Sequence, residues 1–455
     1  MKLTIENIGN VKNAEIEING ISVIAGQNGT GKSTISRSLF SIFSANYDVI
    51  KKISNDRTKA INDFLEDYLS DIEMNRKNNS EIGIARRIVP SFLYTELTKI
   101  ISKNLLIFLD KNYSEHNNES LKKSIIESIN EFNKRNSKYF VLNIKDLDLN
   151  VLSENIKEIL SQSDQSIFNQ ILTAHLTDEF HNQINNIYDP LTGLISLRIK
   201  DEQINVEVNK NRATADKLIN FKTDVVYIDD AAAIVENLFS TKFLNKFSTK
   251  FLNKFSTKFL NEFLNKIDLK LDHNAYLMEQ LRDERNNTYT LRAKITDRLN
   301  LVFNEINHIL KTDIVNSSED EEDEKKLNII NYSSGMKTFY LIKSLLENGV
   351  IRENGTLILD EPEVHLHPEW QLKFAEIIVL LQKEFGLHIL INSHSPYLVE
   401  AIDIFSKKND TNDSVKYYLA NSSIEDVTDS IDKIYEQMYV PLNRLEELAE
   451  DFDGE

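Results

Sequence analysis

The sequence predicts an α/β protein in which a mixed sheet is flanked by helices and a large, mainly helical segment is inserted. Three observations predict this class. The apolar run 21–25 leads through a glycine-rich loop into apolar residues at helical spacing. Strand, helix and strand patterns follow one another over 356–391, which is typical of a parallel crossover. Between these regions, 45–194 is rich in Asn, Lys and Glu and has few prolines, which favours helices.

Length and composition limit the class further. The chain has 455 residues, 41% of them hydrophobic, which is enough for two or three domains. Cysteine is absent, which excludes disulfides and thiolate metal sites. We find neither the apolar run of a signal peptide nor a run of about 18 apolar residues, so we expect a cytoplasmic protein without a membrane partner. The net charge of -18 argues against a protein that coats DNA, but a local basic patch is compatible with DNA contact inside a complex.

The patterns divide the chain into four segments: 1–44, 45–194, 195–420 and 421–455. The first carries the glycine-rich loop, the second is the helical insertion, and the third returns to the sheet. The last segment closes in LEELAEDFDGE, and we expect it to be a solvated acidic tail. The acidic run SEDEEDE at 318–324 is expected to be a solvated loop.

The expected strands are short and are separated by turn residues. In chain order they are 3–5, 14–18, 21–25, 195–199, 204–208, 225–228, 356–360 and 387–391. The fourth and fifth alternate in polarity like an antiparallel pair and bring the chain back to the sheet after the insertion.

An eight-residue repeat, FSTKFLNK, occurs three times over 239–262, with Glu in place of the last Lys in the third copy. The near-identity of the copies indicates a duplication rather than a solenoid, whose repeats are longer. On a helix, the phenylalanines would form a stripe beside the lysines. This predicts packing against a partner helix, with contact to nucleic acid as the alternative.

The glycine-rich loop GQNGTGKS at 26–33 matches the pattern G-x-x-x-x-G-K-[ST] at every fixed position. Backbone amides that the glycines leave open, together with the start of the next helix, hold phosphate oxygens, and Lys32 reaches the β and γ oxygens. The expected ligand is therefore ATP with Mg²⁺, and the Ser33 hydroxyl is a candidate magnesium ligand. The residues expected to contact ATP are Gly26, Asn28, Gly29, Thr30, Gly31, Lys32, Ser33 and Thr34.

Hydrolysis needs a carboxylate for the metal and a group that activates water. The strand TLILDE at 356–361 ends in both, with Asp360 as the expected magnesium ligand and Glu361 as the general base. The next strand ends before His394, which the crossover brings to the same sheet edge, where it is expected to contact the γ-phosphate. Lys32, Glu361 and His394 are the expected catalytic residues.

His365 and His367 have the spacing of a metal-binding pair. No third ligand is evident beside them, so structural roles in their loop are expected instead.

These ordered motifs resemble the ABC-type ATPase family, in the branch that includes SMC-like repair ATPases and overcoming-lysogenization-defect proteins. The sequence YSSGMK at 332–337 resembles the signature motif, although Ser334 and Met336 stand where the family usually has Gly and Gln. The resemblance implies a homodimer, open to higher assembly, in which Ser333 and amides near Gly335 bind the γ-phosphate held by the other subunit. The sequence does not assign a glutamine to the Q-loop, and YIDD at 227–230 lies roughly in its place.

Within this family, the size and the irregular insertion separate the candidates. A transporter ATP-binding subunit is normally shorter, and an SMC-like repair ATPase carries a much longer coiled coil. About 60 residues follow His394, too few for the nuclease domain of overcoming-lysogenization-defect proteins. The chain is similar to the PtuA ATPases of Septu antiphage systems, whose partner PtuB is an HNH nuclease. The resemblance implies that ATP-dependent dimers regulate a separate nuclease subunit, with SMC-like DNA repair and transport as the alternatives.

Overall fold

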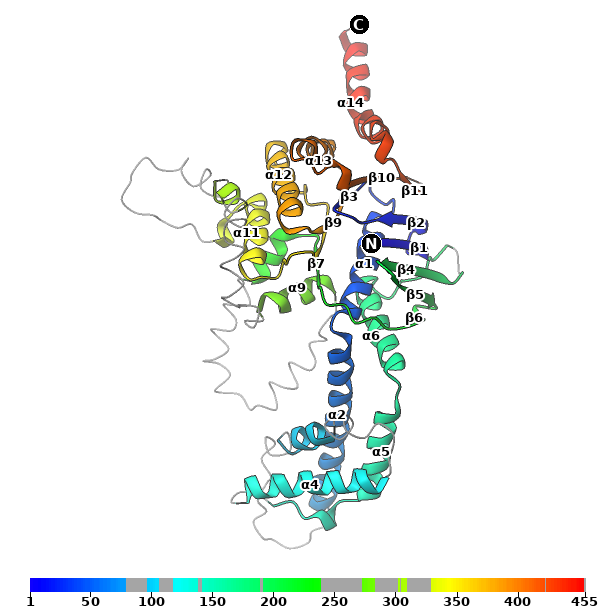
Figure 1. Cartoon of the computed structure of the whole chain (residues 1–455), viewed down its shortest axis with the longest axis vertical. Coiled ribbons are helices and arrows are strands. Elements are labelled where there is room, and N and C mark those ends of the chain that lie inside the picture. The colour runs from blue at the N-terminus through cyan, green and yellow to red at the C-terminus, as the bar shows by residue number, and fades with distance from the viewer. Residues whose placement is uncertain are drawn as a thin grey trace, which may run out of the picture. The chain divides into compact units, whose positions relative to one another are not determined.

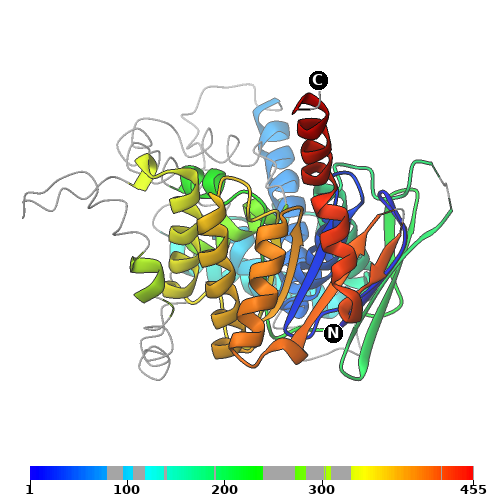
Figure 2. The same ribbon diagram turned by 90° about the horizontal axis from the view of Figure 1, so that it is seen from above.

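The computed structural model describes most of the chain. The described residues are 1–78, 96–105, 118–137, 141–188, 191–238, 272–282, 302, 304–308, 329–421 and 423–453. They belong to two compact units, which we call unit 1 (1–47 and 169–455) and unit 2 (48–168). Figures 1 and 2 show the elements of both. The FSTKFLNK repeat and the acidic run 318–324 lie outside the described residues.

A five-stranded antiparallel sheet forms one layer of unit 1. Its strands, in spatial order, are β2 (Val11–Glu17), β1 (Lys2–Ile8), β4 (Gly193–Ile199), β5 (Glu202–Asn209) and β6 (Arg212–Ala215). The register sets Ile5 of β1 opposite Ile195 of β4, so alternate apolar residues of both strands face the same side. The expected return of the chain to the sheet after the insertion is confirmed by this pairing.

A six-stranded sheet forms the second layer of unit 1, and its strands run parallel except for the edge strand β11. In spatial order they are β11 (Ile424–Asp426), β10 (Val415–Ala420), β3 (Ile21–Gly26), β9 (His388–Ser393), β8 (Thr356–Asp360) and β7 (Val225–Ile228). Parallel strands that are covered on both faces read as continuous apolar runs, which explains the burial of every residue in β3, β7 and β8. The expected α/β class is confirmed.

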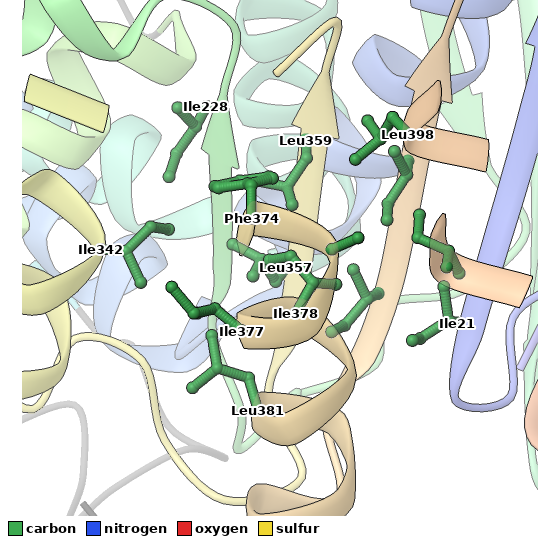
Figure 3. Packing of buried hydrophobic residues seen from close by; sticks show 14 of the residues in the cluster. Ile21, Ile228, Ile342, Leu357, Leu359, Phe374, Ile377, Ile378, Leu381 and Leu398 are labelled. Carbon is green, nitrogen blue, oxygen red and sulfur yellow. The ribbon is translucent and has the colours of Figure 1, made fainter. Parts of the chain in front are cut away.

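Helices cover this sheet and supply most of its core. They are α1 (Lys32–Asn46), α9 (His273–Arg282), α11 (Ser334–Glu347), α12 (Pro368–Phe385) and α13 (Pro396–Lys408). Figure 3 shows Phe374, Ile377 and Ile378 of α12 against Leu357 and Leu359 of β8. The helix α12 begins at a proline, which costs no hydrogen bond there, and ends at a left-handed glycine, as helix termini commonly do.

Unit 2 is helical among its described residues, as the composition of the insertion predicts. Its helices include α2 (Val49–Asn78), α4 (Asn118–Asn136) and α5 (Leu149–Ser161), and together with the helical residues 96–105 they enclose an apolar core of their own. Asp148 caps α5 by accepting hydrogen bonds from the backbone N–H groups of Asn150 and Val151.

The insertion ends earlier than the expected boundary at residue 194. The helix α6 (Asp164–Glu179) runs from unit 2 into unit 1, which begins again at Asn169. The reason is a set of hydrogen bonds to β6, in which Asn169 Oδ1 accepts from Ala215 N at 3.1 Å and Thr173 Oγ1 accepts from Ala213 N at 3.0 Å. Residues 169–194 therefore belong with the sheet rather than with the insertion.

The segment 421–455 is not merely a solvated tail, which corrects the expectation from its charge. It contains the edge strand β11 and the helix α14 (Asp432–Asp453). Ile434 of this helix is fully buried, and Ile431, Tyr435 and Met438 pack on the core of unit 1. The apolar residues at helical spacing outweigh the acidic ones in the first half of the helix. None of the described helices combines the length and the hydropathy needed to cross a membrane.

Candidate active site at the ends of three parallel strands

The glycine-rich loop connects β3 to α1 and has the backbone of a phosphate cradle. Gly29 and Gly31 have φ values of 80° and 93°, in the left-handed region that favours glycine. A Cβ on Gly31 would also lie 2.6 Å from Val11 Cγ2. No side chain caps α1 and no acidic residue stands in its first turn, so its amides are open to an anion.

The rest of the loop gives Lys32 a buried position at the mouth of this cradle. Lys32 is only 4% exposed, and its ammonium donates to Gly26 O and Gln27 O, both at 2.9 Å. The Thr30 hydroxyl also donates to Gln27 O, at 2.9 Å. The two carbonyl partners offset the cost of burying this ammonium, which is the group expected to meet phosphate oxygens. Asn28 and Gly29 are exposed, while Ser33 and Thr34 are half-buried.

Asp360 is held at the end of β8 by hydrogen bonds on both carboxylate oxygens. Tyr227 Oη donates to Oδ2 at 2.9 Å, and Asn392 Nδ2 donates to Oδ1 at 2.8 Å. The Asn392 amide also donates to Ser36 Oγ at 2.8 Å, which ties β9 to α1. Asp360 is 6% exposed, so these bonds fix the orientation of its carboxylate.

Glu361 comes directly after β8 and turns the chain at a φ of 52°. This left-handed conformation costs a non-glycine residue about 1–2 kcal/mol, and it is typical of functional sites. The backbone N–H of Glu361 donates to Asn392 O at 2.9 Å, which secures the turn. Its Oε1 lies 3.8 Å from Lys32 Nζ and 3.6 Å from His394 Nδ1.

The expected residues Lys32, Glu361 and His394 are thus brought together at one sheet edge, although more than 300 positions separate the first from the others. The parallel neighbours β3, β9 and β8 make this possible, because their carboxyl ends meet at the same edge.

Glu363 is a residue of this site that sequence reasoning missed. It is 4% exposed, and its Oε1 accepts hydrogen bonds from Ser393 Oγ and His394 N, both at 2.7 Å. The same oxygen lies 3.3 Å from His394 Nδ1. Burial raises the pKa of Glu363, although the hydrogen bonds that it accepts act in the opposite direction. The only signal in the sequence was a second acid two positions after Glu361.

A cavity of about 290 Å³ opens beside Asp360. Its polar lining comes from α1, from the end of β7 and from the turn after β8, and the charged side chains that reach it are Arg37, Asp229, Asp230, Asp360 and Glu361. Ser33 lines it as well, so the two expected magnesium ligands share one cavity.

Behind Asp360 lies a buried histidine between two acids, which the sequence did not reveal. His273 Nδ1 lies 3.0 Å from Glu179 Oε1, and its Nε2 lies 2.9 Å from Asp229 Oδ2. The ring stacks on Tyr227, with centroids 4.0 Å apart. Burial acts to lower the pKa of His273, but the two carboxylates outweigh it and raise the pKa to about 9. For Asp229, burial acts to raise the pKa, but pairing with His273 leaves it lowered.

The candidate signature segment opens α11. Ser333 is exposed and caps the helix, accepting a hydrogen bond from Met336 N at 3.3 Å. Because the hydroxyl acts there as acceptor, its own proton is still available to a phosphate oxygen. Gly335 is buried, and a Cβ would lie 2.9 Å from Trp370 Cε3 and 3.1 Å from His365 O. Close packing therefore accounts for the glycine.

The two histidines of the loop 362–368 have structural positions. His367 caps α12 by accepting from Glu369 N at 3.4 Å, and His365 has a φ of 76° beside Gly335. No group of three or more His, Cys, Asp or Glu side chains in the described part of the chain is arranged to hold a metal ion.

The residues at this edge nevertheless fit a magnesium nucleotide. The cradle offers open amides and one ammonium to phosphate oxygens, and the cavity offers the Ser33 hydroxyl and the Asp360 carboxylate. Oxygen ligands of this kind suit Mg²⁺, which binds through one or two protein groups and keeps phosphate and water as its other ligands.

Two family models match the sequence on either side of residues 199–226. One, described as "AAA domain", matches residues 2–198, which hold the glycine-rich loop. The other, described as "AAA domain, putative AbiEii toxin, Type IV TA system", matches residues 227–400, which hold Asp360, Glu361 and His394. Sequence similarity to ATPase domains therefore extends over both parts of the site. No curated protein matches the chain.

Solved structures of SMC head domains are among the similar ones. The Smc head domain of Pyrococcus furiosus, with an extended coiled coil and bound to the C-terminal domain of ScpA, has 10% identity and a TM-score of 0.34, and the match covers 98% of each chain. The SMC head domain of Thermotoga maritima has 9% identity and a TM-score of 0.32, and the match covers 94% of this chain and 97% of that one. The fold described above rests on the sheet topology alone.

Proposed function

We propose that this chain is a magnesium-dependent ATPase of the ABC type. One observation carries the proposal: Lys32, Asp360, Glu361 and His394 meet at a single sheet edge beside an uncapped helix start. The similarity to two ATPase domain models supports it.

In this proposal the cradle and Lys32 bind the β- and γ-phosphates, while Ser33 and Asp360 hold Mg²⁺, which neutralises phosphate charge. Tyr227 and Asn392 keep the Asp360 carboxylate oriented. Glu361 accepts a proton from water at Oε1, and His394 donates from its ring to the γ-phosphate. Glu363 holds His394 through the backbone N–H, which limits the positions that the ring reaches.

Two substitutions test the activity. Glu361→Gln is expected to lower ATP turnover by about 100- to 10,000-fold, as loss of a general base does, while ATP binding persists. Lys32→Ala is expected to abolish binding of ATP as well, and Lys416→Ala on β10 is the matched control. Phosphate release and equilibrium binding of a fluorescent ATP analogue measure the two effects. Normal turnover in Glu361→Gln would remove the assignment.

The second part of the proposal is a homodimer with ATP between the copies. The exposed Ser333, whose proton is available, supports it, because a second copy would then complete the phosphate site. Sedimentation of Glu361→Gln is expected to show dimers with ATP and monomers without it. Adding Ser333→Arg should prevent dimers, whereas Ser161→Arg, on an exposed position of α5, should not. Dimers that persist in Ser333→Arg would contradict this interface.

The most specific part of the proposal is a role in antiphage defence. In this role, ATP-bound dimers restrain a separate HNH-type nuclease, and loss of ATP releases the nuclease. The resemblance to Septu ATPases supports it, together with a family description that refers to a putative toxin and a type IV TA system. The test is co-expression with the neighbouring gene, followed by nucleic-acid cleavage at falling ATP concentration. Cleavage that is indifferent to ATP and to Glu361→Gln would contradict this role.

A further inference from the structure

The buried histidine behind Asp360 has no part in the proposed chemistry, yet it lies against a residue that holds the expected metal ligand. His273 is the first residue of α9, which packs beside β7 (Figure 1). It is 6% exposed, and its two ring nitrogens face carboxylate oxygens of Glu179 and of Asp229. Two acids from different elements therefore hold one ring between them.

Glu179 fixes both the backbone and the side chain of His273. It is the last residue of α6 and is 2% exposed. Its Oε1 accepts a hydrogen bond from the His273 backbone N–H and lies 3.0 Å from the ring Nδ1, and its Oε2 lies 3.1 Å from the same nitrogen. Movement of the ring would leave a buried carboxylate without its partner, which is costly. Glu179 thus restrains one end of the ring, and Asp229 restrains the other.

The restrained ring supplies the surface on which Tyr227 of β7 lies. The rings of His273 and Tyr227 are stacked, with centroids 4.0 Å apart and planes 26° apart. Tyr227 is 2% exposed, and its hydroxyl donates to Asp360 Oδ2 at 2.9 Å. Because a tyrosine ring that is held on its face carries its hydroxyl with it, the contacts of His273 reach the expected magnesium ligand through a single side chain.

We propose that His273 is a positioning residue of the magnesium site, which is held by Glu179 and acts on Asp360 through Tyr227. Residues that orient a metal ligand from behind commonly change metal affinity about 10- to 100-fold when they are replaced. The inference rests on the proposed ATPase function, since it needs Asp360 to bind the metal ion. It adds two residues to that site that lie behind the ligand.

The test measures metal binding by the full-length chain and does not rely on turnover. Mn²⁺ replaces Mg²⁺, and the electron paramagnetic resonance signal reports free Mn²⁺ in the presence of a non-hydrolysable ATP analogue. His273→Gln is expected to weaken Mn²⁺ binding by about 10-fold, the lower end of the range for such residues. Binding of a fluorescent ATP analogue in EDTA is expected to be unchanged, because Lys32 keeps its contacts in the cradle.

A second buried histidine provides the matched control. His175 lies one turn before Glu179 on α6, is 2% exposed and has its Nδ1 3.2 Å from Ser44 Oγ. His175→Gln therefore perturbs the same helix at a similar depth, and its Mn²⁺ binding is expected to match that of the unchanged chain. Both variants are compared where urea unfolding shows them to be folded. An equal loss of Mn²⁺ binding in both would attribute the effect to core damage and overturn the proposal.

A double-mutant cycle tests the path through Tyr227. If His273 acts through the Tyr227 hydroxyl, its replacement has little effect once that hydroxyl is gone. His273→Gln combined with Tyr227→Phe should therefore weaken Mn²⁺ binding about as much as Tyr227→Phe alone. Effects of the two substitutions that multiply would show that they act independently, and would overturn this path.

The remaining outcomes separate this inference from the proposed function. Glu179→Gln is a milder variant that keeps the size of the side chain, and it should weaken Mn²⁺ binding in the same direction if His273→Gln does not fold. Unchanged Mn²⁺ binding in the variant that folds would overturn the inference alone, provided that the unchanged chain binds Mn²⁺ with the nucleotide analogue. If the unchanged chain binds no Mn²⁺, the proposed magnesium site is wrong and the inference falls with it.

Discussion

The buried pair of acids around His273 makes the stability of unit 1 depend on pH. The pKa of His273 is about 9 in the folded chain, against an ordinary value of 6.5. A folded pKa above the unfolded one means that the native state binds the proton more tightly. The stabilisation is therefore fully present below about pH 6.5 and is lost as the pH rises through about 9. At about 1.4 kcal/mol per tenfold change in proton affinity, this amounts to about 3 kcal/mol.

The variant His273→Gln isolates this contribution. It leaves Glu179, which is 2% exposed, without a cationic partner, so we expect the variant to be less stable than the unchanged chain at pH 6.5. The difference in the free energy of unfolding should narrow by about 3 kcal/mol between pH 6.5 and pH 9.5, because the unchanged chain loses its proton there.

Urea unfolding followed by tryptophan fluorescence measures the free energy of unfolding of unit 1, where His273 lies. The sole tryptophan of the chain, Trp370, lies on α12 and reports on unit 1. His181→Asn is the matched control, since His181 is exposed and Asn tolerates its φ of 48°. If the difference in the free energy of unfolding between the unchanged chain and His273→Gln stays constant from pH 6.5 to pH 9.5, His273 is not a buried imidazolium.

Three further substitutions have defined outcomes. Tyr227→Phe removes one hydrogen bond to the Asp360 carboxylate. We expect the free energy of unfolding in urea to fall by about 1.5–3 kcal/mol and half-maximal turnover to need a higher magnesium concentration. An unchanged magnesium midpoint would contradict the positioning role. Glu363→Gln keeps the shape of the side chain but weakens the hydrogen bonds that it accepts from Ser393 Oγ and His394 N. ATP turnover should fall while ATP affinity is retained. Equal turnover would show that Glu363 does not position His394. Gly335→Ala forces a contact with Trp370 and should cost about 1–3 kcal/mol, with a shift in tryptophan emission; no change in either would refute the close packing.

The alternative of SMC-like DNA repair makes a different demand on the same protein. It requires ATP turnover to respond to DNA, whereas the defence proposal requires it to control a nuclease. Turnover measured with and without duplex DNA at low and high salt separates the two, because phosphate contacts weaken steeply as salt rises.

The strands and the phosphate cradle could be predicted from the sequence because their signals are local. The expected runs 21–25, 225–228 and 387–391 match β3, β7 and β9 to within two residues at each end. Continuous apolar runs predict buried parallel strands, and closely spaced glycines predict a loop that needs left-handed backbone. The assignment of strands to sheets was not local, since β1 and β2 join β4 in one sheet, where β1 pairs with β4, while the adjacent β3 joins the other sheet.

The sequence by itself determined which functional groups follow one another along the chain. These are a phosphate cradle before a helix, two acids at the end of a strand, and a histidine after the next strand. The tertiary structure alone decided the partners of Asp360 and His394, because Tyr227, Asn392 and Glu363 reach them only after the strands align. The same holds for His273, whose two acids come from α6 and from the end of β7. Buried polar groups must find partners wherever folding brings them, and no sequence spacing encodes that choice.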